Sequence, residues 1–240
     1  MVVAKIQLAA INNAIREVCI ALEEKCQRPA PCWASMAEDD LWRELVACIL
    51  GSRVRFEAAH AAVERMERLR LFCEPQRLSR FQQYELEVME ALSGKYAAGR
   101  QGRYPFFRMR AKQIRRAAER IYGSGDTLRS LLRSSRDVRD VRRRLIMEVS
   151  GLGPKQASLF LRNIGYAVHV TVLDIHILTY MRWIGLTESI MASIPSLRKY
   201  EALERAFIGH AYSLGYTPDC FDLAVWVVMR VVKEGQRTWE

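Results

Sequence analysis

One lysine stands where its amine could act as a nucleophile. Lys155 directly follows Gly151-Leu152-Gly153-Pro154, and Pro154 favours the first turn of a helix, where its missing N–H costs nothing. A cation in that turn lies unfavourably beside the positive end of the helix dipole. Together with partial burial, this placement would favour the neutral, nucleophilic amine. The alternative is a charged lysine that simply contacts a phosphate.

A single carboxylate interrupts an apolar stretch further along the chain. Asp174 lies within Val170-Thr-Val-Leu-Asp-Ile-His-Ile-Leu178. A carboxylate there could accept a proton or stabilise positive charge. It could also be the N-cap of a following helix, and the two roles are compatible. His176 could contact a ligand, although a hydrogen-bonded structural histidine is the alternative.

The two glycines before Lys155 predict a tight turn between two helices. Gly151 and Gly153 allow backbone conformations that other residues resist, and they let another group approach the backbone closely. A glycine turn that leads into a helix N-terminus exposes N–H groups at the positive end of the dipole, and this is an anion site. Such a site would fix a phosphate without reading a sequence. An ordinary helix–helix turn is the alternative for Gly-x-Gly taken alone.

The charge of the chain agrees with an anionic partner. Among 240 residues, 37 are Lys or Arg and 27 are Asp or Glu, which gives a net charge of +10. A basic excess favours polyanions through long-range attraction and counterion release. Residues 100–144 contain fourteen arginines, of which many are explained equally well as solvated helix faces.

The cysteines and the chain start indicate a reducing compartment. No two of the six cysteines form a CxxC pair, so core thiols are the preferred interpretation and metal ligation by Cys19, Cys26 and Cys32 the alternative. The start of the chain lacks the pattern of a secretory signal, and no apolar run reaches the ~18 residues of a membrane span. We therefore expect a cytoplasmic, nucleoid-associated protein.

Helical periodicity runs through nearly the whole chain. Half of the residues are apolar, which is enough for a core, and no strand or repeat pattern is found. The sequence predicts an all-α fold of about ten or eleven helices. Their expected ranges are 5–26, 38–50, 55–71, 79–93, 108–122, 126–133, 137–149, 154–164, 172–184, 196–213 and 218–233.

These motifs resemble those of a known enzyme superfamily. Gly-Leu-Gly-Pro-Lys155, followed by Leu-Asp174-Ile-His-Ile, resembles the hairpin and catalytic loop of the bifunctional helix-hairpin-helix DNA glycosylase/lyases. Within them the chain looks most like the archaeal-type 8-oxoguanine DNA glycosylase/AP lyase branch. Softer matches over roughly residues 40–230 lie at 103–106 with 110–114, at 158–166 and at 222–226.

The resemblance implies a fold and a reaction. Two helical subdomains would hold DNA and a flipped base in the cleft between them. Residues 1–53 with 172–240 would form one, and residues 54–171 a helical barrel carrying the hairpin at about 137–165. Lys155 would be the nucleophile and Asp174 the catalytic carboxylate in base excision repair of an oxidised purine, through a Schiff base and β-elimination.

The resemblance also implies roles for residues around the two catalytic groups. Phosphate or strand contacts would come from Gly151, Gly153, Pro154, Ser52, Arg53 and His176, with Ser52 and Arg53 at the place where related enzymes carry wedge residues. The base pocket would consist of Phe106, Trp226 and Asp222. Core packing is the alternative for the two aromatics, and a surface helix cap for Asp222.

The sequence departs from relatives in the superfamily. Only Cys220 follows Asp174, so the four-cysteine iron–sulfur loop of many members cannot form. No cofactor or metal is required, apart from a structural monovalent cation that hairpin carbonyls could hold. Residues 1–37 have no assigned role, and the C-terminus is not lysine-rich, which leaves the lesion open.

The expected partner is damaged double-stranded DNA, bound by a monomer with no membrane contact. Three alternatives to the main interpretation remain. One is a glycosylase for another lesion or for foreign DNA. The second is a monofunctional enzyme that uses water activated by Asp174. The third is a DNA-binding hairpin protein without activity.

Overall fold

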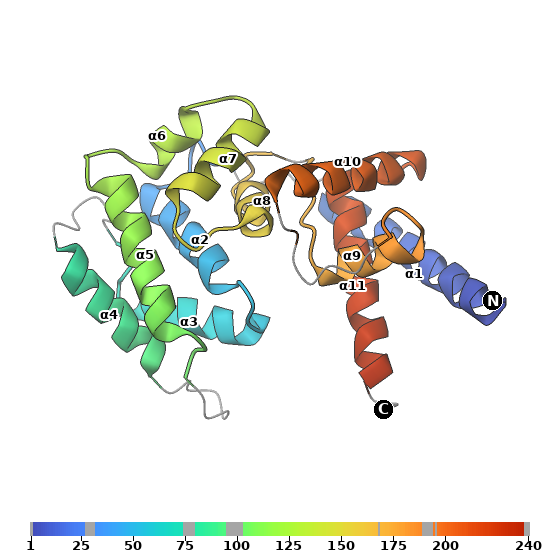
Figure 1. Cartoon of the computed structure of the whole chain (residues 1–240), viewed down its shortest axis with the longest axis horizontal. Coiled ribbons are helices and arrows are strands. Elements are labelled where there is room, and N and C mark those ends of the chain that lie inside the picture. The colour runs from blue at the N-terminus through green and yellow to red at the C-terminus, as the bar shows by residue number, and fades with distance from the viewer. Residues whose placement is uncertain are drawn as a thin grey trace. The chain divides into compact units, whose positions relative to one another are not determined.

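The computed structural model describes residues 2–26, 32–73, 80–94, 103–167, 169–188, 194 and 196–237, and these contain helices and no strand (Figure 1). The predicted all-α fold is confirmed. No helix of the described part combines the length and hydropathy that a membrane span needs. The helices are α1 (Val2–Cys26), α2 (Glu38–Leu50), α3 (Phe56–Arg68), α4 (Phe81–Ser93), α5 (Phe107–Tyr122), α6 (Leu128–Arg133), α7 (Val138–Glu148), α8 (Pro154–Asn163), α9 (Ile175–Trp183), α10 (Leu197–Ser213) and α11 (Pro218–Arg237).

The chain forms two compact units. Unit 1 consists of Met1–Ala30 and Ala167–Glu240, and unit 2 of Pro31–Tyr166. This division differs from the expected one, because residues 31–53 belong to unit 2. The reason is α2, which buries one whole side among the other helices of unit 2.

Helix α2 is at the centre of the unit 2 core. Its residues Leu41, Leu45 and Ile49 recur at helical spacing and are fully buried, and α2 contacts α3, α5, α6 and α8. Each such side chain contributes about 1.5–3 kcal/mol through burial. Trp42 donates its indole N–H to the Tyr84 hydroxyl at 3.1 Å, so a buried polar tip is also satisfied.

The terminal helices build the core of unit 1. Helix α11 contacts α1, α9 and α10, and Figure 1 shows these four helices together. Ile15 and Cys19 of α1 are both 2% exposed. The N-terminal segment, to which the sequence assigns no role, therefore supplies part of this core.

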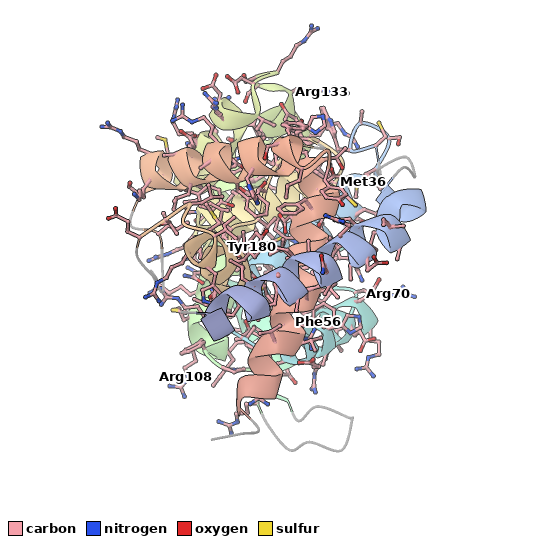
Figure 2. The ribbon with its side chains drawn as sticks, turned by 90° about the vertical axis from the view of Figure 1, so that its right-hand side faces the viewer. Met36, Phe56, Arg70, Arg108, Arg133 and Tyr180 are labelled. Carbon is pink, nitrogen blue, oxygen red and sulfur yellow. The ribbon has the colours of Figure 1, made fainter. Side chains whose placement is uncertain are left out.

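A polar contact joins α1 to the rest of unit 1. Figure 2 shows Tyr180 of α9 between α1 and α10. Its hydroxyl donates to Asn12 Oδ1 at 3.2 Å and lies 3.4 Å from His210 Nε2.

The cysteines follow the core interpretation in part. The thiols of Cys19, Cys48 and Cys220 are buried and form no disulfide among the described residues, whereas Cys32 and Cys73 are exposed. The side chain of Cys26 lies outside the described residues. Cys32 is exposed because it precedes α2 in the loop that begins unit 2.

Candidate active site

The glycine hairpin joins α7 to α8 as the sequence predicts. Val149 closes α7, with its N–H donating to Leu145 O at 2.9 Å. Gly151 has φ +90°, in the left-handed region that favours glycine. Gly153 is the N-cap of α8, and Pro154 occupies the first turn. Helix α8 therefore begins where a proline lacking its N–H is best tolerated.

The two hairpin glycines have different surroundings. A Cβ on Gly151 would lie 2.8 Å from Gln113 Oε1, so this glycine is fixed by the packing of unit 2 as well as by its φ. A Cβ on Gly153 would meet no described atom within 4 Å. Since nothing in the chain requires glycine there, the open space beside the first N–H groups of α8 is available to an external group such as an anion.

Lys155 is half-buried in the first turn of α8 and makes no hydrogen bond or ion pair with any described residue. The neighbouring Gln156 is buried and donates from Nε2 to Cys48 O at 2.9 Å, which ties the start of α8 to the end of α2. Burial raises the pKa of the nearby Cys48 thiol well above its ordinary value, and Glu44 raises it further. Cys48 therefore stays a neutral thiol and leaves the lysine amine as the candidate nucleophile.

The loop after α2 carries Ser52 and Arg53. Three side chains hold this end of α2: besides Gln156, the Tyr104 hydroxyl donates to Leu50 O at 2.5 Å, and Arg110 Nη2 donates to Ser52 O at 2.6 Å. They satisfy carbonyls that a helix C-terminus leaves without intrahelical partners. The loop is thus anchored to the unit that carries Lys155.

Phe106 is exposed at the start of α5. Its side chain is 54% exposed, so the core-packing alternative is wrong for this residue. Its φ of 61° lies in the left-handed region, although N-cap residues are normally extended. A bulky residue in this conformation is strained, and such strain is concentrated at functional sites.

The segment that leads to Asp174 is held by side chains of unit 1. Residues 170–173 are non-helical and buried, so their backbone groups need partners. The N–H groups of Thr171, Val172 and Leu173 donate to one side chain each. The acceptors are Glu204 Oε1 at 3.2 Å, Asp222 Oδ2 at 2.6 Å and the Tyr200 hydroxyl at 3.1 Å, respectively.

Asp174 is the N-cap of α9, as the sequence predicts. Its Oδ1 accepts the N–H of His176 at 2.8 Å and that of Ile177 at 3.0 Å. Its Oδ2 accepts no hydrogen bond from the described residues. One oxygen thus fixes the carboxylate while the other remains available for chemistry.

Three further expected site residues lie near Asp174 in unit 1. The rings of His176 and Trp226 are 6.4 Å apart in an edge-on arrangement, and the Arg230 guanidinium is 5.3 Å from the half-buried Trp226 ring. Asp222 is only 3% exposed, which excludes a surface cap. Its carboxylate accepts the Val172 N–H, because α11 faces the segment before Asp174 at this point. The contact of Asp222 with a base stays a prediction.

The anchoring residues are those that sequence reasoning misses. Arg110 and Gln113 support the loop and hairpin of unit 2, and Tyr200 and Glu204 support the Asp174 segment of unit 1. In the sequence, each of these residues is marked only by being polar at a helical position that faces the core. The sequence alone does not distinguish such a position from one on a solvated helix face.

The chain matches the family model described as 8-oxoguanine DNA glycosylase over residues 22–216. It belongs to this family. The match spans the positions of Lys155 and Asp174 and ends before Asp222 and Trp226.

One relative matches in sequence, and two solved structures match in fold. The 8-oxoguanine DNA glycosylase/AP lyase of Saccharolobus solfataricus is 27% identical over 80% of this chain and 84% of its own length. The structure of the 8-oxoguanine DNA glycosylase of Thermotoga maritima has a TM-score of 0.67 at 23% identity, covering 93% of this chain and 95% of its own. That of the Methanocaldococcus jannaschii 8-oxoguanine glycosylase/lyase with 15mer DNA containing 8-oxoguanine has a TM-score of 0.61 at 20% identity, covering 91% and 88%.

Proposed function

We propose that this family member is a bifunctional 8-oxoguanine DNA glycosylase/AP lyase in which Lys155 is the nucleophile. The observation that carries the proposal is the placement of Lys155: it stands at the start of α8, next to an open glycine N-cap, and forms no hydrogen bond or ion pair with the described residues. A half-buried amine at this position is available for covalent chemistry beside a phosphate site.

The proposed reaction begins with attack of the neutral Lys155 amine on the sugar C1′. The bond from C1′ to the base breaks, its electron pair leaves with the base, and the base takes up a proton. The lysine nitrogen loses a proton, the C1′–O4′ bond breaks, O4′ takes up that proton as a hydroxyl, and a protonated imine forms between the lysine nitrogen and C1′. Removal of a C2′ proton then breaks the C3′–O bond, and the 3′ phosphate leaves as β-elimination is completed. Water finally hydrolyses the imine and restores the lysine.

Asp174 would assist this sequence as a carboxylate. Its fixed Oδ1 and available Oδ2 suit it to accept the lysine proton or to stabilise positive charge on the sugar. A water-activating Asp174 without Schiff-base chemistry is the monofunctional alternative. The presence of an amine at the N-terminus of α8 favours the lyase.

The other site residues are proposed to bind the DNA of a monomeric enzyme. Gly153 and Pro154 would receive a phosphate at the N-terminus of α8. Gly151 would shape the turn, and the carbonyls of the hairpin would hold a monovalent cation. Ser52 and Arg53 would enter the duplex, and His176 would contact the backbone. Phe106 and Trp226 would stack on the flipped base, which must leave the duplex for reaction. The substrate would place the enzyme at the nucleoid.

The test is borohydride trapping on a labelled duplex with one 8-oxoguanine opposite cytosine, run beside uracil and abasic-site duplexes. We expect a covalent adduct with the wild-type protein on the 8-oxoguanine strand. Lys155→Ala should abolish it, whereas Lys199→Ala, which removes an exposed lysine from the first turn of α10, should not. Asp174→Asn should lose turnover and retain affinity.

Each other outcome has a defined meaning. An adduct that survives in Lys155→Ala overturns the nucleophile assignment. Base release without any adduct supports the monofunctional alternative. An adduct on the abasic duplex alone supports lysine chemistry on a different lesion.

A further inference from the structure

Unit 2 contains a buried arginine that none of the proposed chemistry uses. Arg110 is 4% exposed. Its Nη2 donates to Ser52 O at 2.6 Å and its Nη1 to Gln113 Oε1 at 2.8 Å. No carboxylate of the described residues pairs with it. Burying a charge without an ionic partner is costly, so this position calls for an explanation.

The position of Arg110 supplies part of that explanation. Its guanidinium lies at the C-terminal end of α2, where the carbonyls and the helix dipole are negative. Tyr104, which donates to the adjacent Leu50 O, is also in electrostatic contact with Arg110, which lowers the Tyr104 pKa against the larger rise caused by burial. A cation here satisfies the Ser52 carbonyl, which follows the end of α2.

Two functional segments meet at this one side chain. The first is the loop of Ser52 and Arg53, held through Ser52 O. The second is the hairpin, because Gln113, held by Arg110, occupies the space where Gly151 lacks a Cβ. Phe106 is joined to Arg110 through the main chain alone, where its carbonyl accepts the backbone N–H of Arg110 at 2.9 Å.

The backbone strain of unit 2 points to the same place. Three described non-glycine residues have positive φ: Arg53 at 63°, Phe106 at 61° and Arg70 at 56°. Arg70 is explained by the end of α3, where the Leu71 N–H donates to Met66 O at 2.9 Å as in a helix C-terminal motif. Arg53 directly follows Ser52, whose carbonyl accepts from the Arg110 guanidinium, and Phe106 lies one helical turn before Arg110. Strained residues persist where their surroundings over-determine them.

We propose that Arg110 is a positioning residue for duplex opening. It holds the Ser52–Arg53 loop, with its strained Arg53, in register with Gln113 and the hairpin, so that the exposed Arg53 is already placed when DNA arrives. This inference rests on the proposed function. Arg110 itself touches neither base nor sugar, so its loss slows opening of a paired lesion and spares the lysine chemistry.

The experiment compares one lesion in two contexts. Single-turnover excision is measured on 8-oxoguanine paired with cytosine and on 8-oxoguanine in an unpaired bulge, and strand cleavage is measured on a preformed abasic duplex. Arg110→Met should slow the paired reaction by roughly ten- to a hundredfold, the size of effect that misplaced groups produce. The other two reactions should stay within about threefold of wild type, well below the loss expected for the paired lesion.

Two further variants separate positioning from folding. Arg110→Lys keeps the charge but cannot present a planar fork to Ser52 O and Gln113 together, so we expect a partial loss confined to the paired lesion. Arg115→Met, on the same helix, removes ion pairs to Glu85 and Glu119 and should lower all three activities equally or not at all. If the Arg110 variants slow all three reactions equally, the proposal is overturned.

A second readout does not depend on excision. A 2-aminopurine placed beside 8-oxoguanine gains fluorescence when the duplex opens on binding. Wild type and Arg115→Met should give this gain, and Arg110→Lys should give less. Wild-type fluorescence gain without any covalent adduct would count against the proposed chemistry but support opening. An unchanged gain in both Arg110 variants would refute the positioning role.

Discussion

Asp222→Ala distinguishes an anchor of the catalytic loop from a reader of the base. Asp222 is 3% exposed and accepts the Val172 N–H at 2.6 Å, and Val172 is itself 6% exposed. A hydrogen bond to a charged group contributes about 1.5–3 kcal/mol, and its loss leaves the buried N–H without an acceptor. We therefore expect a loss of about 2–3 kcal/mol in the free energy of unfolding. For a chain of this size, that corresponds to a melting temperature lower by about 4–12 °C.

The same change should affect catalysis through the Asp174 segment. Val172 lies two residues before Asp174, so a loosened segment misplaces the carboxylate and lowers the excision rate more than DNA affinity. Asp222→Asn keeps an acceptor oxygen and should lose less stability than Asp222→Ala. Asp219→Ala, in the first turn of the same helix, is the matched control and should change neither quantity.

Thermal unfolding and binding to duplexes with 8-oxoguanine or guanine decide between the two roles. The anchoring argument expects a lower melting temperature with an unchanged preference for the lesion. If Asp222→Ala melts like wild type and no longer prefers 8-oxoguanine to guanine, the carboxylate reads the base and our reasoning about Val172 is wrong.

Two other predictions concern the hairpin and the pH dependence of unit 1. Gly153→Ala should fold normally but weaken DNA binding, since its Cβ would enter the open space where a phosphate is proposed. Gly151→Ala should lower the melting temperature, because of its φ of +90° and the contact with Gln113. Fluorescence anisotropy measures DNA binding and thermal unfolding measures stability; equal melting temperatures of the two variants would contradict the different roles of the two glycines. Burial lowers the pKa of His210 from 6.5, so the unfolded chain binds more protons than the folded one as the pH falls below about 6.5. The stability that neutral His210 contributes should therefore be fully present above that pH and decrease below it. His210→Gln should flatten this dependence in melting experiments at pH 5 to 7.5. If the melting temperature of the variant falls with pH as steeply as that of wild type, another group causes the effect.

Local sequence chemistry predicted the hairpin and the N-cap of α9. Pro154 in the first turn of α8 and Asp174 as the N-cap of α9 were both predicted correctly, because each depends on bonds within a few residues. The boundaries of α2 also agree with the predicted 38–50. Apolar residues at helical spacing fix such an element before any tertiary contact is known.

Long-range anchors could not be predicted in this way. Arg110 and Ser52 are 58 positions apart, and Asp222 and Val172 are 50 apart. No periodicity links such pairs, and each side chain is equally suited to solvent or DNA until the fold is known. The boundary expected at residue 53 differed for the same reason, since the buried face of α2 predicts a core but not which helices complete it.

The arginines of unit 2 therefore do not all count as DNA-binding charge. Arg110 donates to Ser52 O, and Arg129 donates to Ala34 O at 2.6 Å and to Met36 O, so both are committed to backbone carbonyls. In a helical protein the loops have no neighbouring strands, and their buried carbonyls need side-chain donors. A net charge of +10 thus overstates the number of phosphates that the protein can neutralise. The salt dependence of binding, which reports phosphate contacts, should be the same in Arg110→Met as in wild type even where the variant opens the duplex poorly.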